Sequence, residues 1–343
     1  MRAARASAPG KVILFGEHAV VYGRPALAAP VTQVQATATV QPASGGFWVE
    51  APGVGRRFQI SEAASGDPLA AAVALTCAYV GQAIPEGVVL RVESTIPIAS
   101  GLGSGAAVCT AVVRAVSAYV GRPLGDAAVA ALVFQTEKLL HGVPSGIDNT
   151  VVAYGQPIYF VKGQPPALFT VARPFRLLIG DTGLSSPTKI AVGDVRAAYE
   201  REPERYSRLF DAMGAIAREA RALIESGQPP ESDTEASSWG SRLRPTSGDV
   251  GLQRAQKGIA YEVALGQFMN RNHALLREIG VSSPELEVLV ECALSAGAPG
   301  AKLSGGGRGG NMLALVTPET EAAVHSALEQ GGARRVIGTT VGM

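Results

Sequence analysis

A glycine-rich loop that opens directly into a helix is the feature that most constrains this fold. Residues Pro97–Ala107 read PIASGLGSGAA, and an apolar helical stretch follows as far as Tyr119. Glycine lets a ligand approach the backbone closely, and the unpaired N–H groups of a helix N-terminus bind anions. The pattern therefore predicts a phosphate site. It lacks both the Walker sequence GxxxxGK[ST] and the acidic residue that follows a dinucleotide fingerprint.

A second glycine-containing segment lies near the N-terminus. Residues Pro9–Gly23 read PGKVILFGEHAVVYG, and Lys11–Phe15 has the pattern of a strand. Such a strand brings the cation Lys11, the carboxylate Glu17 and the imidazole His18 to one rim, which suits a small polyoxygenated anion. Taken alone, exposed Lys and Glu residues are commonly solvated surface.

The third segment, Lys302–Gly310, reads KLSGGGRGG. Four of its glycines lie within five residues, namely Gly305, Gly306, Gly307 and Gly309. A simple turn needs fewer, so we expect another chain segment or a ligand to approach the backbone there. A flexible surface loop is the alternative, which the apolar strand after the loop disfavours.

Two carboxylates supply candidate acid chemistry in the segment EKLLHGVPSGIDN. Glu137 is expected on a helix and Asp148 in the turn after it, so that both face one cavity. Phosphoryl transfer uses such a pair, because one carboxylate holds Mg²⁺ and the other lies beside the attacking hydroxyl. Each carboxylate alone is as well explained by surface placement.

The remaining pattern predicts mixed strands and helices, with no internal repeat. Expected strands are Lys11–Phe15, Thr32–Gln41, Gly87–Ser94, a strand from Phe175, Asn311–Val316 and Arg335–Thr340. Expected helices are Pro68–Val80, Ala106–Tyr119, Asp126–Leu140, one from about Thr188, an amphipathic one through Leu209–Ile224, one near Tyr261–Ile279, one from Pro284 with Ser283 as N-cap, and Pro318–Leu328 with Thr317 as N-cap. His273 and His325 are expected on helix surfaces, and His141 is expected to form hydrogen bonds in a turn.

Length and charge narrow the class of protein. A chain of 343 residues favours two domains, and a net charge of +1 gives no field that would gather nucleic acid or anionic membrane. The uncharged stretch Pro68–Ile84 is short for a membrane span, and no signal peptide is recognised, so a cytoplasmic protein is expected. The three cysteines have no metal or disulfide spacing, and each is expected to be a small buried apolar residue.

One segment interrupts the regular pattern. Residues Ser226–Gly251 include 13 Ser, Gly or Pro residues among 26, between two expected helices. A flexible insertion without chemistry is the favoured interpretation. A lid over the active site is the alternative, which Trp239, Arg242 and Arg244 support.

The three glycine-containing segments and the segment with Glu137 and Asp148 together resemble the GHMP kinase family. This family includes galactokinase, homoserine kinase, mevalonate kinase and phosphomevalonate kinase. The family's three blocks occur in order near residues 9, 97 and 302, and so span essentially the whole chain. GEHAVVYG, HGVPSGIDN and DTGLSSPTK are similar to mevalonate kinases of the archaeal and bacterial type. The resemblance implies an α+β fold of two domains, with the active site between them. It further implies that residues 1–170 resemble the second domain of ribosomal protein S5 and that residues 171–343 form a ferredoxin-like domain.

The resemblance also implies roles for single residues in an ATP- and Mg²⁺-dependent kinase that phosphorylates mevalonate. Asp148 takes the proton of the substrate's primary hydroxyl, Lys11 pairs with Asp148, and Glu137 binds Mg²⁺. The substrate-binding residues are Glu17, His18, Thr188, Gly305 and Gly306. Gly307 completes the loop that supports the site. The ATP-binding residues are Pro97, Ser100, Gly101, Leu102, Gly103, Ser104, Gly105, Ala106 and Ala107. A homodimer is expected as well, with neither nucleic acid nor membrane as a partner.

One departure concerns the metal. The family's phosphate loop usually reads GLGSSAA, with a serine hydroxyl on Mg²⁺, but the second serine is here Gly105. Either Ser104 or water then supplies that oxygen.

Two alternatives to a mevalonate kinase stay open. A phosphomevalonate or homoserine kinase is one, although only Lys189 and Arg24 offer extra cations for a phosphorylated substrate. A non-catalytic binding protein of the same fold is the other.

Overall fold

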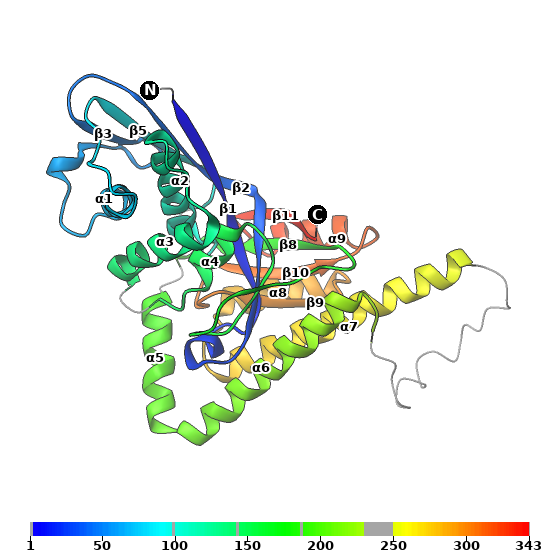
Figure 1. Cartoon of the computed structure of the whole chain (residues 1–343). Coiled ribbons are helices and arrows are strands. Elements are labelled where there is room, and N and C mark those ends of the chain that lie inside the picture. The colour runs from blue at the N-terminus through cyan, green and yellow to red at the C-terminus, as the bar shows by residue number, and fades with distance from the viewer. Residues whose placement is uncertain (1–2, 98–99, 142–143, 186–187, 230–249, 343) are drawn as a thin grey trace.

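The computed structural model describes residues 3–97, 100–141, 144–185, 188–229 and 250–342. Its strands and helices form two sheets with helices packed on them, so the predicted α+β class is confirmed (Figure 1). Most of the predicted insertion 226–251 lies outside the described residues. In the part of the chain that is described, no helix is both long and apolar enough to cross a membrane.

The first sheet has the strand order β4-β3-β5-β2-β6-β7, and β1 pairs with β2. All its pairings are antiparallel except the parallel pair β3 and β5. Its strands are β1 (Ala4–Phe15), β2 (Ala26–Pro42), β3 (Phe47–Ala51), β4 (Arg56–Gln59), β5 (Val88–Ser94), β6 (Ile158–Phe160) and β7 (Ala167–Leu168). The short 3₁₀ helices are η1 (Ala19–Tyr22), η2 (Pro52–Val54) and η3 (Ile60–Glu62).

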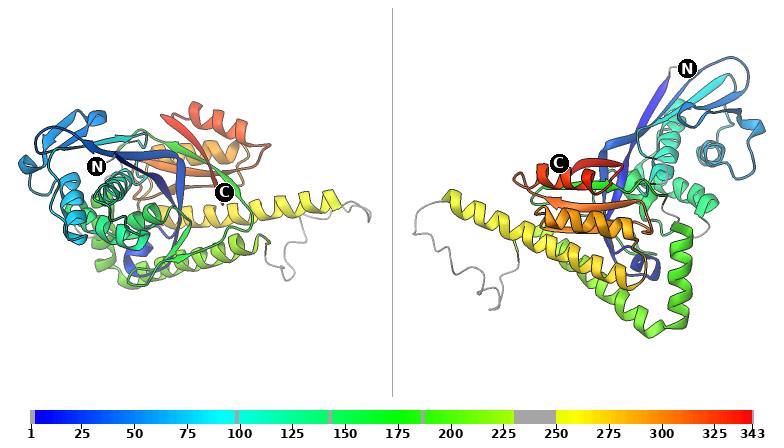
Figure 2. Two further views of the ribbon diagram at one scale, coloured as in Figure 1. Left: turned by 45° about the horizontal axis from the view of Figure 1, so that its top comes forward. Right: turned by 180° about the vertical axis from the view of Figure 1, so that it is seen from behind.

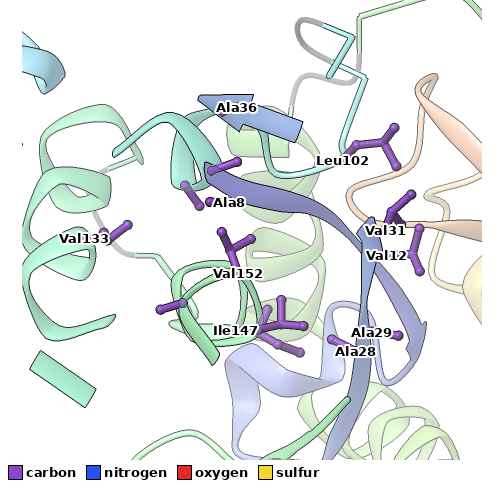
Figure 3. Close-up of a cluster of buried hydrophobic side chains, with 14 of the residues drawn as sticks. Ala8, Val12, Ala28, Ala29, Val31, Ala36, Leu102, Val133, Ile147 and Val152 are labelled. Atoms are coloured by element: carbon purple, nitrogen blue, oxygen red, sulfur yellow. The ribbon is translucent and has the colours of Figure 1, made fainter. Parts of the chain in front are cut away.

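Four helices accompany this sheet: α1 (Pro68–Tyr79), α2 (Ser104–Tyr119), α3 (Asp126–His141) and α4 (Ile147–Tyr154). Helices α2 and α4 pack on β1 and β2, where Ala28, Ala29 and Ala36 are fully buried (Figure 3). Small side chains let helix and sheet approach closely. Ile147 is buried in the same core, which fixes the start of α4.

The second sheet is antiparallel with the order β11-β8-β10-β9. Its strands are β8 (Phe175–Asp181), β9 (Gly300–Ser304), β10 (Asn311–Val316) and β11 (Arg335–Val341). Successive side chains point to opposite faces of a strand. Leu177 and Leu313 accordingly join the core shared with the first sheet, whereas Leu178 and Met312 join a second core with α8 and α9. The second sheet is therefore apolar on both faces.

The remaining helices are α5 (Thr188–Arg201), α6 (Pro203–Ser226), α7 (Val250–Glu278), α8 (Pro284–Ser295) and α9 (Glu321–Gln330). The long helices α6 and α7 lie side by side in all views (Figures 1 and 2). The predicted start of α8 is confirmed, because Pro284 is its first residue and the Ser283 hydroxyl accepts a hydrogen bond from the Leu286 N–H.

Several local predictions were wrong. Helix α9 begins at Glu321 and not at Pro318, because the Thr317 carbonyl accepts hydrogen bonds from the N–H groups of Thr320 and Glu321 and closes a turn first. His141 is the last residue of α3 instead of a turn residue. Cys292 is only half-buried, although Cys77 and Cys109 are buried as expected.

Candidate active site

The centre of the site is an ion pair between two predicted residues. Lys11 Nζ on β1 lies 3.0 Å from Asp148 Oδ1, and the Lys11 side chain is only 4% exposed. The prediction placed Asp148 in a turn, which is wrong: Asp148 is the second residue of α4, after Gly146 with φ of 93°. The left-handed Gly146 starts the helix early enough to include Asp148. The carboxylate, one-third exposed, therefore faces a buried cation and remains accessible.

The glycine-rich loop lies directly against Lys11. The Lys11 N–H donates a hydrogen bond to the Leu102 carbonyl at 2.9 Å. A Cβ on Gly103 would lie 2.7 Å from Lys11 Cγ, so only glycine leaves room for the lysine stem. Gly103 is also the N-cap of α2, with φ of 72°, and it has no side chain to cap the helix. The first N–H groups of α2 thus face the region beside the ion pair, as an anion site requires.

The predicted ATP-binding residues differ in exposure. Gly105 is exposed, and Gly101, Gly103 and Ser104 are half-buried. The side chains of Leu102, Ala106 and Ala107 are buried in the core. These three can therefore contribute only backbone groups. The Ser100 hydroxyl donates to the Pro97 carbonyl at 3.0 Å.

Glu137 lies on α3 near the ion pair and is 5% exposed. Burial is the main cause that raises its pKa to about 7; the negative charge of Asp148 adds to this effect, and Lys11 opposes it. A nearby cation would favour the ionised form. A buried carboxylate in this electrostatic setting is suited to bind a divalent metal.

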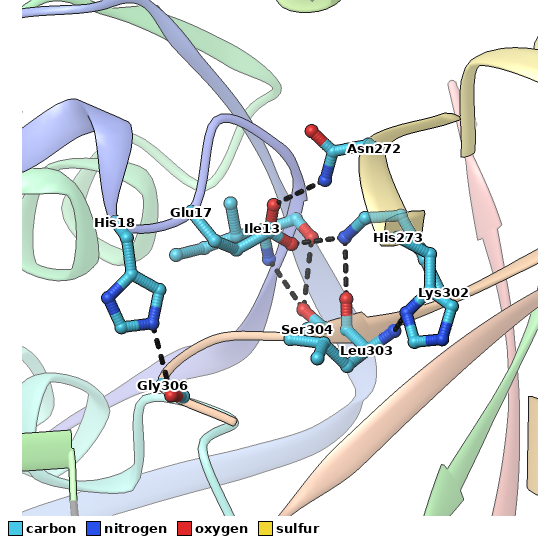
Figure 4. Close-up of polar contacts among 9 residues, drawn as sticks. All are labelled: Ile13, Glu17, His18, Asn272, His273, Lys302, Leu303, Ser304 and Gly306. Carbon is cyan, nitrogen blue, oxygen red and sulfur yellow. Dashed lines mark hydrogen bonds and ion pairs between the residues drawn. The ribbon is translucent and has the colours of Figure 1, made fainter. Parts of the chain in front are cut away.

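Glu17 was predicted to line the substrate pocket, but the structure places its carboxylate in a buried network instead. Its side chain is fully buried, forms an ion pair with Lys302 on β9, and accepts a hydrogen bond from Asn272 Nδ2 at 3.0 Å (Figure 4). Burial lowers the pKa of Lys302, and the Glu17 charge opposes that shift. A buried ion must be paired, and Glu17 thereby connects the turn after β1 with β9 and α7.

His273 belongs to the same network, and its predicted place on a helix surface is wrong. The ring is buried on α7, its Nδ1 accepts a hydrogen bond from the Leu303 N–H at 3.4 Å, and its Nε2 lies 3.2 Å from Glu287 Oε1. Burial lowers its pKa despite the nearby Glu287. His325, by contrast, is exposed on α9 beside Glu329, as predicted.

His18 lies at a strained turn between β1 and η1. Its φ and ψ are 58° and −49°, and the Ala19 N–H donates to the Glu17 carbonyl at 2.6 Å, which closes a γ-turn. Its Nε2 lies 3.1 Å from the Gly306 carbonyl. Burial is the main cause that lowers the pKa of His18 to about 4. The ring is therefore neutral at pH 7, and Nε2 must carry the proton because a carbonyl only accepts.

The C-terminal glycine loop is filled by protein. A Cβ on Gly306 would lie 2.8 Å from Thr188 Oγ1, and one on Gly307 would lie 2.0 Å from the Val281 carbonyl oxygen. The prediction that another segment approaches this backbone is confirmed. Thr188, the first residue of α5, is exposed beside this loop.

Two polar residues that the sequence did not single out connect the second sheet, one to strand β1 and the other to the phosphate loop. The Ser304 hydroxyl donates to the Ile13 carbonyl at 3.0 Å and accepts from the Ile13 N–H at 3.2 Å. Asn311 Nδ2 donates to the Ser100 carbonyl of the phosphate loop. Both flank the C-terminal glycine loop, and that position was the only signal that could have found them.

Among the residues that the structure describes, no group of three or more His, Cys, Asp or Glu side chains could hold a metal ion. A site formed by protein side chains alone is thus absent from the described part. Magnesium commonly takes one or two carboxylates together with substrate phosphates and waters, and Glu137 beside the α2 N-terminus fits that arrangement.

Comparisons with known proteins agree with this geometry. The family model for the GHMP kinases N terminal domain matches residues 68–156, and the model for the GHMP kinases C terminal region matches residues 261–334. Mevalonate kinases of Thermococcus sibiricus and Pyrococcus furiosus are 36% and 35% identical to the chain; each match covers 97% of the chain and 94% of the relative.

Solved structures give the same result. A crystal structure of L. major mevalonate kinase in complex with R-mevalonate is 29% identical, with a TM-score of 0.76 over 98% of this chain and 95% of that one. The Methanococcus jannaschii mevalonate kinase, at 22% identity and a TM-score of 0.77, covers 99% of this chain and 98% of its own, and shows the shared fold. The chain belongs to the GHMP kinase family, and the relatives described here are mevalonate kinases.

Proposed function

We propose that this enzyme transfers the γ-phosphate of ATP to the 5-hydroxyl of mevalonate, which gives 5-phosphomevalonate and ADP. The observation that carries the proposal is the Lys11–Asp148 ion pair directly beneath the phosphate loop. Mevalonate kinases that match 97% of this chain support the proposal, as does the position of Glu137 near the ion pair.

The chemistry follows from the positions of charge. Asp148 would accept the proton of the attacking hydroxyl, while Lys11 stabilises charge on the attacking oxygen and on the transferred phosphoryl group. The N–H groups at the start of α2 would hold the ATP phosphates. Phosphoryl transfer leaves little covalent work for the protein, so positioning and charge neutralisation should supply most of the rate enhancement.

Magnesium is proposed as the metal that accompanies ATP. Glu137 would hold it, with Ser104 or water as a further oxygen ligand, and the ion would neutralise charge on the phosphates when bound. Glu137 is suited to this role because its buried carboxylate lies in the field of Asp148, where an added cation is favourable.

The structure gives the phosphomevalonate alternative little support. Arg24 was one of two extra cations for a phosphorylated substrate, but its Nε lies 3.0 Å from Asp211 Oδ1 and its NH1 donates to the Tyr22 carbonyl at 2.7 Å. Lys189 alone remains, exposed on α5. Homodimer formation and a cytoplasmic location stay predictions.

A coupled assay of ADP release across mevalonate, phosphomevalonate, homoserine and galactose tests the proposal. Mevalonate should have the highest kcat/KM. A tenfold preference for another substrate, about 1.4 kcal/mol in the barrier, would overturn the assignment. Absence of turnover with every alcohol would favour a non-catalytic binding protein. ADP release without added alcohol serves as the background.

A further inference from the structure

Two residues other than glycine have a left-handed φ in the described part of the chain, and they lie on loops that touch. His18 has φ of 58° and Arg308 has φ of 57°. The ring of His18 contacts the carbonyl of Gly306, two residues before Arg308 (Figure 4). A Cβ makes this conformation unfavourable, and it persists where the surroundings enforce it. Such residues concentrate at functional sites. The contact between the His18 turn and the loop that carries Arg308 is therefore a candidate for a further function.

Arg308 is the only residue with a side chain between Gly305 and Gly310. Its guanidinium forms an ion pair with Asp194 on α5, and its NH2 donates to the Gly280 carbonyl at 3.4 Å. Its backbone N–H donates to the Val281 carbonyl at 2.8 Å. One residue thus fastens the glycine loop to α5 and to the turn between α7 and α8.

Stability does not explain an arginine at this position. Glycine would adopt the same φ without strain. The ion pair is partly solvated, with side chains 34% and 55% exposed for Arg308 and Asp194, and exposed pairs contribute little to folding. What the Arg308 side chain does instead is hold α5 in place relative to the C-terminal glycine loop.

Helix α5 is attached to the loop at two points. Its first residue, Thr188, lies against Gly306, where a Cβ would come within 2.8 Å of Thr188 Oγ1. Asp194 follows six residues later, nearly two helical turns at about 3.6 residues per turn. Two attachments prevent the helix from pivoting about either one. The positions of Thr188 and of the Gly306 carbonyl that contacts His18 are thereby linked.

We propose that Arg308 is a positioning residue for the alcohol substrate. Its ion pair with Asp194 holds α5 and the glycine loop so that Thr188 and His18 face the substrate together. This inference rests on the proposed function, because Thr188 and His18 are substrate residues only if that proposal holds. The phosphate loop meets the glycine loop at Asn311, whereas the contacts of Arg308 are to Asp194, Gly280 and Val281. ATP binding should therefore depend little on Arg308.

Steady-state kinetics of Arg308→Gly, Asp194→Asn and the double variant test the proposal. Each single variant should raise the KM for mevalonate about five- to tenfold, with kcat and the KM for ATP within twofold of wild type. The KM for mevalonate of the double variant should not exceed that of the more strongly affected single variant, because both substitutions remove the same contact. Arg308→Lys, which keeps the charge, should restore part of the affinity.

The matched control is Arg205→Ala, which removes a comparable exposed arginine paired with Glu202 at 3.2 Å. It should leave the KM for mevalonate unchanged. An unchanged KM in Arg308→Gly, or an equal rise in the KM for ATP, would overturn the proposal. So would a KM increase that also appears in Arg205→Ala.

NMR of the histidine rings gives a readout that does not depend on turnover. The charge of Arg308 contributes to the lowered pKa of His18. The His18 ring signals should therefore move in Arg308→Gly and Asp194→Asn, but not in Arg205→Ala; His18→Asn assigns them. Asp194→Asn leaves the Arg308 charge in place, so movement of the signals in that variant reports position and not loss of charge. If they move there while wild type fails to phosphorylate mevalonate, the link between α5 and His18 stands and only the proposed function falls. If they stay in place in both variants, Arg308 does not position His18, whatever the kinetics show.

Discussion

The loop at residues 101–107 and the loop at residues 305–310 have similar compositions but different surroundings. A Cβ on Gly101 would meet only Asn311 Nδ2, at 3.9 Å, and Gly105 is exposed. A Cβ on Gly306 or Gly307 would instead collide with Thr188 or Val281. Gly101 and Gly105 of the first loop leave space that a ligand can occupy, whereas Gly103 of that loop, like Gly306 and Gly307 of the second, lets protein segments meet. A glycine-rich sequence by itself therefore does not distinguish a binding loop from a packing loop.

The charged residues beside the two loops differ in the same way. Near the first loop, Asp148 is one-third exposed and faces Lys11. Near the second, Glu17 and Lys302 are fully buried and neutralise each other. Substitutions near the first loop should therefore act mainly on rate, and those near the second mainly on stability or substrate affinity.

The largest effect is expected for Asp148→Asn. The change keeps the size but removes the proposed proton acceptor, so kcat should fall about 10²- to 10⁴-fold, the usual contribution of a general base. The KM for ATP should change little, because Asp148 acts mainly in the transition state. Steady-state kinetics with mevalonate measure both values. Asp126→Asn, an exposed carboxylate on α3, is the control; a near-wild-type kcat in Asp148→Asn would disprove its role.

Gly307→Ala should have the largest effect on stability. The new Cβ would lie 2.0 Å from the Val281 carbonyl oxygen at a φ of 73°. Overpacking and the left-handed conformation together should lower the free energy of unfolding by about 3 kcal/mol. Gly101→Ala has the φ penalty without the collision and should lose only about 1 kcal/mol. Denaturant titration compares them, and equal losses would contradict the distinction between the loops.

Glu137→Gln tests the metal at the first loop. The change removes the only charged protein ligand that we propose for Mg²⁺, so the Mg²⁺ concentration for half-maximal rate should rise about tenfold or more. A Mg²⁺ titration at saturating ATP and mevalonate measures it. Wild-type metal dependence in this variant would mean that the metal lies elsewhere.

The second loop should make stability depend on pH through His18. Its pKa is about 4 in the folded chain, below the unfolded value of about 6.5. Above pH 6.5 both states are neutral and the contribution is complete. As the pH falls toward 4, only the unfolded chain binds the proton, so stability falls by up to about 1.4 kcal/mol per pH unit. His18→Asn should flatten this slope in denaturant titrations between pH 4 and 7; an unchanged slope would argue against a buried neutral His18.

Much of this arrangement could be predicted from local sequence. Periodicity and capping residues located most elements, and the motif residues Lys11 and Asp148 were expected to pair, as they do. The failures concern contacts between distant segments. Glu17 was expected in the substrate pocket and His273 on a helix surface, but β9 supplies Lys302 to the one and the Leu303 N–H to the other. No local pattern indicates which buried charge meets which partner 285 residues away.

Helix boundaries failed for a related reason. Asp148 was expected in the turn after the helix that carries Glu137, but left-handed Gly146 lets α4 begin at Ile147. The start of α9 moved because the Thr320 N–H donates to the Thr317 carbonyl and the Thr320 hydroxyl accepts from the Thr317 N–H, which forms a separate turn. One backbone angle decides the first boundary and two hydrogen bonds decide the second, and propensity encodes neither.

The smallest effect is expected for Gly105→Ser, which asks whether the first loop tolerates a side chain. Gly105 is exposed and lies in the first turn of α2, where its backbone is helical. Serine is well tolerated near a helix start, and the added hydroxyl would offer Mg²⁺ the oxygen that water otherwise supplies. Activity should be kept, and the Mg²⁺ concentration for half-maximal rate should fall about twofold. Loss of activity in Gly105→Ser would show that the first loop has no free space at Gly105.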